Sequence, residues 1–186
     1  MTDQRKSYWY AFVTKPRHEK CVNERLHDAG MQVYLPMQEK MRQWKDRKKI
    51  IKVPLFSCYI FVHIPFMERY EVLKVPSIVR IVSIGTEPSP VRNEEITAIQ
   101  RILESDVYFK VGESLAAGDR VKIDNGPLRD IEGDLVYFRG THRLAVNIEA
   151  LGKSLIVDID RRAVSKVCCL DKRSSEVRKR MEATFK

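Results

Sequence analysis

The residues best suited to chemistry are basic ones crowded into a short segment. Between positions 40 and 52 the sequence has seven Lys or Arg residues against a single Asp, with Trp44 among them. Clustered cations neutralise phosphates, and an indole ring stacks on unpaired bases. The alternatives are a hairpin tip whose lysines only protect a strand edge, and a Trp44 that packs on lysine stems. The density of charge favours contact with a nucleic acid.

Two acidic residues and four cysteines are the other candidates for chemistry. Asp158 and Asp160 share one strand face, a spacing seen in metal-dependent nucleases. Two arginines follow at once, no His or Glu motif accompanies the pair, and we expect neither an enzyme nor a metal or cofactor site. The cysteines form no C-x-x-C pair, which indicates small buried residues rather than zinc ligands.

Composition limits the class of protein. The chain has 186 residues, a net charge of +9, 44% hydrophobic and 32% charged residues, which is typical of a globular protein with one domain or two small ones. Its apolar runs are about half of what spans a bilayer, and the first residues lack the apolar core of a signal peptide. We therefore expect a cytoplasmic monomer without a membrane partner.

The first half of the chain predicts an α+β fold. Strand patterns cover 8–13, 31–38, 55–63 and 78–84, helical patterns cover 17–29, 66–74 and 93–104, and the basic segment forms a protruding hairpin. Segment 55–63 is apolar on both faces, with Phe56, Cys58, Ile60 and Val62 on one side. Tyr59 and Phe61 are on the other. A central strand covered by helices on both faces is one interpretation. Three helices on this sheet instead favour an aromatic surface open to a partner.

The second half predicts only short strands. Alternating apolar residues are separated by turn signals at 124–127, 140–142 and 152–154, which favours a small β-barrel. The predicted organisation is an N-terminal α/β sandwich over 1–106, a linker over 107–115, a barrel over 116–168 and a charged tail over 169–186.

Several motifs match a known family. The opening Trp9-Tyr10 strand, the first helix, the basic hairpin and segment 54–62 resemble the N-terminal domain of NusG-type transcription elongation factors. Segment 118–128, followed by Gly133, is similar to their KOW motif; its matching positions are Gly118, Val121, Ile123, Gly126, Pro127 and Gly133. The resemblance covers about 8–167. Segments 15–20 and 42–48 look closest to the UpxY branch, antiterminators of surface-polysaccharide operons related in role to RfaH.

One departure concerns the turn before the aromatic strand. Many relatives have Phe-Pro-x-Tyr where this chain has Phe-Ser-Cys-Tyr at 56–59. Proline would fix φ at this point, whereas Ser57 leaves the turn looser. The aromatic positions are retained, so the resemblance predicts the same surface with less rigidity.

The resemblance implies a mechanism. Family members bind the clamp helices of the largest RNA polymerase subunit through an apolar depression and thereby suppress pausing and termination. Its lining here would be Val13, Phe56, Tyr59, Phe61 and Ile84. Positions near the non-template DNA strand would be Lys15, Arg17 and His18, although for His18 general exposure favours a surface residue without function. Upstream DNA would be reached by Arg42, Trp44, Lys45, Arg47, Lys48 and Lys49.

The predicted barrel carries little net charge. Residues 111–170 contain nine basic and nine acidic side chains, whereas a barrel that binds RNA is expected to be basic. The resemblance therefore implies a protein partner, such as ribosomal protein S10. The competing hypothesis is a ribosome-associated RNA-binding protein with a KOW segment. Some relatives fold this domain back as helices over the polymerase site, but the strand alternation and glycines here favour a barrel.

Overall fold

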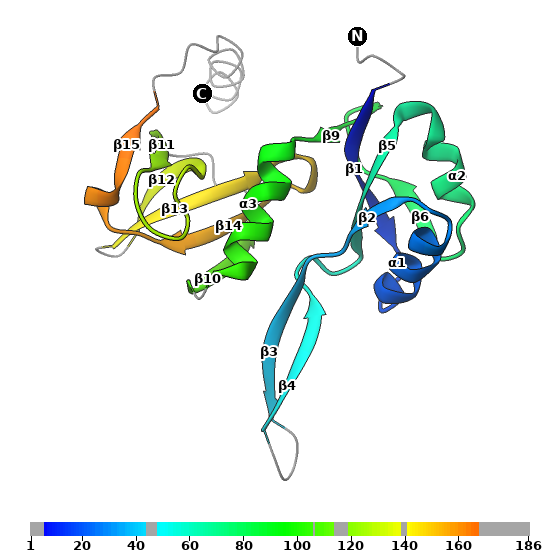
Figure 1. The fold of residues 1–186 in the computed structure, drawn as a ribbon, viewed down its shortest axis with the longest axis horizontal. Helices are drawn as coiled ribbons and strands as arrows, with labels where there is room; N and C mark the ends of the chain where they lie inside the picture. The colour runs from blue at the N-terminus through cyan, green and yellow to red at the C-terminus, as the bar shows by residue number, and fades with distance from the viewer. Residues whose placement is uncertain (1–5, 44–47, 106, 114–118, 139–140, 168–186) are drawn as a thin grey trace, which may run out of the picture.

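A computed structural model describes residues 6–43, 48–105, 107–113, 119–138 and 141–167 (Figure 1). The N-terminal part is built on a five-stranded antiparallel sheet in the order β2-β5-β1-β6, with β9 added beside β1. Its strands are β1 (Ser7–Thr14), β2 (Gln32–Tyr34), β5 (Tyr59–Pro65), β6 (Ile78–Ile81) and β9 (Pro90–Val91). The α+β prediction for this half of the chain is confirmed, and β5 lies inside the sheet between β2 and β1.

One face of this sheet is covered by α1 (Glu19–Asp28), by the 3₁₀ turn η1 (Phe66–Glu68) and by α2 (Arg69–Lys74). Tyr10 and Phe12 of β1 pack there against Val22 and Leu26 of α1. All three predicted helices are present, although α1 begins two residues late because Arg17 has a left-handed φ of 66°. No helix in the described ranges is both long and apolar enough to cross a bilayer.

The opposite face of the sheet packs into a larger apolar cluster. Trp9, Ala11 and Phe61 lie in this cluster together with Ile99 of α3 (Asn93–Glu104) and Leu144 of the C-terminal sheet. Figure 1 shows α3 between the two sheets. Strand β5 is therefore covered on both faces, and the predicted open aromatic surface is not found in this conformation. The spacing of apolar residues along α3 explains why this face of the sheet is covered. These residues extend over two adjacent faces of the helix, so α3 can pack against both sheets.

The turn before β5 also differs from the prediction. Phe56 shares the cluster of Phe61, not that of Ile60 and Val62. Cys58 has a left-handed φ of 67°, so the chain turns over 55–58 and the alternation of a strand begins only at Tyr59. Counting alternate residues from Phe56 therefore assigned this ring to the wrong face.

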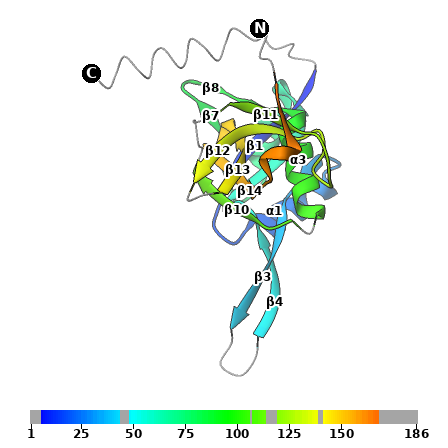
Figure 2. The ribbon, with the colours of Figure 1, turned by 90° about the vertical axis from the view of Figure 1, so that its left-hand side faces the viewer.

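The basic segment forms a separate two-stranded ribbon of β3 (Met37–Gln43) and β4 (Lys48–Pro54). Figures 1 and 2 show this hairpin projecting away from both sheets. Pro36 separates it from β2, because a proline cannot donate to a sheet ladder, so the predicted strand 31–38 is divided in two. A second small ribbon joins β7 (Ser83–Ile84) to β8 (Glu87–Pro88).

The C-terminal part is one six-stranded antiparallel sheet in the order β10-β14-β13-β12-β11-β15. Its elements are β10 (Phe109–Glu113), β11 (Arg120–Ile123), β12 (Glu132–Phe138), β13 (Thr141–Ile148), η2 (Glu149–Leu151), β14 (Lys153–Asp158), η3 (Arg161–Ala163) and β15 (Val164–Lys166). Strand β10 lies within the predicted linker, so this sheet begins earlier than residue 116. The predicted tail 169–186 lies outside the described residues.

The described KOW positions lie in the core of this sheet and in one of its turns. Val121 and Ile123 are buried, and Gly126 takes a φ of 92° in the exposed turn that also contains Pro127. A Cβ at Gly133 would stand 2.6 Å from the carbonyl oxygen of Ala145, so only glycine permits this close pairing of β12 and β13. Gly118 lies outside the described residues.

Candidate functional site

Aromatic rings from three neighbouring strands and from the turn before β5 form a continuous cluster on one face of the N-terminal sheet. The centroid of Phe61 lies 6.2 Å from that of Phe56 and 6.3 Å from that of Tyr34. Trp9 continues the series, 6.4 Å from Tyr34. We call these four residues the ring cluster. Edge-to-face and stacked contacts at these distances stabilise the set beyond its burial alone.

The structure brings most of the predicted polymerase-binding residues to this cluster. Val13 and Tyr59 are half-buried and pack against the larger apolar cluster that contains these rings, whereas Phe56 and Phe61 are only 2% and 0% exposed. Ile84 lies apart on β7 and is 56% exposed. Trp9 and Tyr34 were not predicted to belong to this face. Partial burial raises the pKa of the Tyr34 hydroxyl, because the ionised form would lose hydration there.

The turn that carries Phe56 is held by a buried carboxylate. The Cys58 amide donates to Glu19 Oε1 over 2.8 Å, and the Cys58 carbonyl accepts from the Thr14 amide over 2.8 Å. Glu19 is only 5% exposed, so water competes little for this bond. The turn therefore has an anchor despite having Ser57 where relatives have proline. Sequence reasoning missed Glu19 because its partner is 39 residues away.

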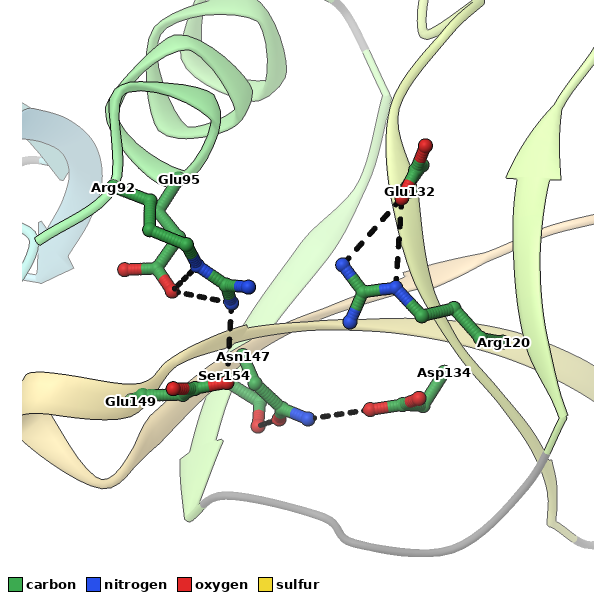
Figure 3. Close-up of polar contacts among 8 residues, drawn as sticks. All are labelled: Arg92, Glu95, Arg120, Glu132, Asp134, Asn147, Glu149 and Ser154. Carbon is green, nitrogen blue, oxygen red and sulfur yellow. Dashed lines mark hydrogen bonds and ion pairs between the residues drawn. The ribbon is translucent and has the colours of Figure 1, made fainter. Parts of the chain in front are cut away.

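Few polar contacts join the C-terminal sheet to α3. Arg92, at the start of α3, has its Nη2 atom 2.8 Å from Glu95 Oε1 and 3.1 Å from Glu149 Oε1 (Figure 3). Near the other end of the helix, Arg101 Nη1 donates to the carbonyl oxygen of Arg129 over 2.9 Å. Glu149 lies in η2 and Arg129 in the turn before β12, so these contacts tie the two ends of α3 to the C-terminal part. We call α3 together with the C-terminal sheet the cover of the ring cluster.

Glu95 is the unusual member of this ion pair. Burial raises its pKa, and the hydrogen bond and positive charge of Arg92 only partly offset that effect. For Arg92, burial acts to lower the pKa, but the hydrogen bond and charge of Glu95 outweigh it and the net shift is upward. Burial dominates at Glu95 because its side chain is almost fully enclosed, whereas that of Arg92 is about half exposed.

Other polar groups of the C-terminal sheet have structural partners. Asn147 Nδ2 donates to Asp134 Oδ2 over 2.7 Å, and the hydroxyl of buried Ser154 bonds Asn147 Oδ1, which ties β12, β13 and β14 together (Figure 3). Asp158 accepts from Arg143 over 2.7 Å. Asp160 caps η3 by accepting from the Arg162 amide. In the described ranges no three His, Cys, Asp or Glu side chains are placed to hold a metal ion.

The loop between β1 and α1 presents the first group of predicted nucleic-acid contacts. Lys15, Arg17 and His18 are all exposed. The loop is fixed against Ser77, whose carbonyl accepts from the Lys15 amide over 2.8 Å and whose hydroxyl lies 3.0 Å from His18 Nδ1. His18 therefore has a structural contact as well as an exposed ring edge, and both interpretations of it stand.

The hairpin presents the second group. Lys48 and Lys49 are exposed, and Arg42 pairs with Lys49 in the ladder. Trp44, Lys45 and Arg47 lie outside the described residues. The structure adds Met41 and Ile50, which are 66% and 60% exposed and stand directly opposite each other. Sequence reasoning concentrated on the charges here, although the apolar residues between them were the available signal.

The described residues thus comprise two antiparallel sheets, an enclosed aromatic cluster and a projecting basic ribbon. Residues 7–100, half of the chain, match the family described as transcription termination factor nusG. The chain therefore belongs to the NusG family, whose members are transcription termination and antitermination factors rather than enzymes.

Individual relatives agree with this assignment. The transcription termination/antitermination protein NusG of Deinococcus radiodurans is 28% identical over 188 residues, covering 85% of this chain and 98% of the relative. The corresponding protein of Halalkalibacterium halodurans is 21% identical over 174 residues, covering 86% and 98%.

Two solved structures are also similar. One shows domain interaction in Thermotoga maritima NusG, with 23% identity, 89% of this chain and 99% of that chain covered, and a TM-score of 0.49. The other is an MjSpt4:Spt5 complex in conformation B, with 17% identity, coverage of 88% and 99%, and a TM-score of 0.31.

Proposed function

We propose that this chain is a specialised NusG-family antiterminator of the UpxY branch, which suppresses pausing and termination at surface-polysaccharide operons. It would bind the clamp helices of the largest RNA polymerase subunit through Val13, Phe56, Tyr59 and Phe61, with Ile84 at the margin. The observation that carries this proposal is the ring cluster, because an apolar aromatic face is what a docked helix tip requires.

Binding would require part of the cover to move. Phe56 and Phe61 are enclosed in the conformation described here, while Tyr59 is already half-exposed. The C-terminal part of the cover is joined to α3 by the Arg92–Glu149 ion pair and the Arg101–Arg129 hydrogen bond, both between exposed or half-exposed groups. Contacts of this kind are weak individually, so the main cost of moving the cover is the apolar packing that it shares with the rings. A clamp helix would then take the place of the cover on the rings.

Nucleic-acid contacts would be divided between two basic groups. Lys15, Arg17 and His18 would face the non-template DNA strand. The hairpin, with Arg42, Trp44, Lys45, Arg47, Lys48 and Lys49, would reach upstream DNA. Both groups are exposed where the structure describes them, and Figures 1 and 2 show α1 on the side of the N-terminal sheet from which the hairpin projects.

The C-terminal sheet would recruit a protein, such as ribosomal protein S10. Its balance of acidic and basic residues supports a protein partner over RNA. Several cations of this sheet are also paired with carboxylates, in the ion pairs Lys122–Asp130, Arg120–Glu132 and Lys166–Asp119. A ribosome-associated RNA-binding protein is the competing function, and it requires free basic surface on this sheet.

The test is a pull-down with core RNA polymerase, followed by single-round transcription through a pause site and a terminator. Tyr59→Ala should weaken polymerase binding at least tenfold, since it removes a ring at the edge of the docking face. Tyr70→Ala is the matched control, because Tyr70 is 55% exposed on α2, away from the ring cluster. If ribosomal subunits retain the protein and core polymerase does not, the competing function is correct.

A further inference from the structure

An exposed apolar pair lies in the middle of the basic hairpin. Met41 and Ile50 are directly opposite each other in the β3–β4 ladder, and about two-thirds of each residue is accessible to water. Paired side chains of this size gain little by remaining in water, so their position indicates that a partner covers them. No function assigned above uses them.

The neighbours of this pair identify the partner. On the same face the adjacent rungs of the ladder are Glu39 with Lys52 and Gln43 with Lys48. The only carboxylate of the described ribbon, Glu39, lies 3.8 Å from Lys52 Nζ. Lys40 and Lys49 are exposed on the opposite face of the same two strands. An apolar centre flanked by cations matches a surface with apolar groups between two rows of negative charge.

We propose that the hairpin enters the major groove of double-stranded DNA and places Met41 and Ile50 against thymine methyl groups. The lysines at 40, 48, 49 and 52 would then lie along the two flanking phosphate backbones. The major groove is about 12 Å wide and admits a two-stranded ribbon, and the thymine methyl is the apolar group displayed there. This inference rests on the proposed contact between the hairpin and upstream DNA, and it names the form of DNA and the residues that touch bases.

The exposed apolar groups in the middle of the ribbon suit a duplex better than a single strand. Proteins that hold single strands stack bases on aromatic rings. Met41 and Ile50 are aliphatic, whereas Trp44, the aromatic side chain of the basic segment, lies outside the described residues. Aliphatic groups suit methyl contacts in a groove better than stacking on a base.

The experiment measures binding of the full-length protein to two DNA duplexes by fluorescence anisotropy between 50 and 200 mM salt. One duplex is rich in thymine, and the other has uracil at every thymine, so it lacks only the methyl groups. Wild-type protein should bind the thymine duplex more tightly, by about fourfold for each methyl group that becomes buried. The same sequence as a single strand should bind more weakly than either duplex.

Variants separate the apolar from the electrostatic contribution. Met41→Gln with Ile50→Gln should remove the preference for thymine and leave the salt dependence unchanged. Lys40→Gln with Lys49→Gln should keep the preference and lower the slope of log affinity against log salt by about 0.9 for each phosphate that is no longer neutralised. Val79→Gln is the control, since Val79 is 56% exposed on β6, outside the hairpin.

Any one of four binding results would overturn the inference. These are equal affinity for the two duplexes, failure to bind either duplex, tighter binding of the single strand, and a thymine preference that survives Met41→Gln with Ile50→Gln. So would a photo-crosslinker at position 50 that reacts with protein rather than DNA in the elongation complex. The same preparations are tested for polymerase binding. Retained polymerase binding with any of these results rejects the groove contact alone, whereas loss of polymerase binding rejects the proposed function.

Discussion

The ring cluster and the hairpin are two apolar surfaces in opposite states. Phe56 and Phe61 are enclosed and form part of the core, whereas Met41 and Ile50 stand exposed on a ribbon that neither sheet supports. Under the proposed function, the hairpin can contact DNA in this conformation. The ring cluster contributes to stability, and its proposed use in binding requires the cover to move, so binding and stability are coupled there under that proposal. Substitutions should therefore separate binding from stability in the hairpin and not in the ring cluster.

The largest expected effect is on the free energy of unfolding. Phe56→Ala should lower it by about 3–5 kcal/mol, because a buried ring is removed and the space is filled only partly. Met41→Ala, a comparable truncation at an exposed position, should change it by less than about 0.5 kcal/mol. Urea denaturation of both variants measures this difference. Equal decreases would mean that the two surfaces do not differ in the way the structure indicates.

The next effect is on DNA contact. Changing Lys45, Arg47, Lys48 and Lys49 together to Gln should weaken crosslinking to DNA in the elongation complex by tenfold or more. It should also lower the salt slope of binding by up to about 0.9 for each phosphate that these cations neutralise. Polymerase binding through the ring cluster should stay near that of the wild type. Unchanged crosslinking would show that these cations only keep the hairpin soluble.

Local sequence signals predicted the elements well and their assembly less well. The three helices, the doubly apolar β5 and the alternating strands of the C-terminal sheet follow from hydrophobic period alone. The face on which Phe56 lies did not follow from this period. Cys58 has a left-handed backbone that interrupts the alternation, and Glu19, which anchors the Cys58 amide, is distant in sequence. The cover over the ring cluster was also missed. The pairing of Arg92 with Glu149 spans 57 residues, and the charge pattern of a single sequence does not indicate such a pair.

The kinds of residue in the candidate site were predicted better than their exposure to solvent. Resemblance indicated the aromatic residues, and charge density indicated the hairpin, but neither indicates exposure. Met41 and Ile50 were overlooked because an apolar residue in a strand is ordinarily assigned to a core. Only the register of β3 and β4, which sets them opposite each other on an isolated ribbon, shows otherwise.

A smaller effect concerns the cover itself. Glu149→Gln removes the charge that joins the C-terminal sheet to Arg92, which should make the ring cluster easier to expose. Exposed ion pairs contribute up to about 1 kcal/mol, so polymerase affinity should rise by at most about fivefold. Glu71→Gln is the matched control, since it breaks the local Lys74–Glu71 pair on α2. A titration of labelled polymerase with the three proteins measures the change.

A decrease in affinity on Glu149→Gln would mean that this carboxylate contacts the polymerase directly and does not hold the cover. An equal rise in the Glu71→Gln control would assign the effect to net charge instead. Only a rise confined to Glu149→Gln supports a cover that competes with the clamp helices.

The smallest effect is a pH dependence at Glu95. Because burial raises the pKa of this carboxyl, the folded protein binds its proton more readily than the unfolded chain does. The group's contribution to stability is therefore fully present below the ordinary value of 4.5 and is lost as the pH rises through the higher folded value. Glu95→Gln cannot titrate, so the free energy of unfolding of the wild type relative to this variant should increase between pH 7 and pH 4.5. Urea denaturation at several pH values measures this difference. A wild-type advantage over Glu95→Gln that shrinks as the pH falls would show that the charge of Arg92, not burial, controls this carboxyl.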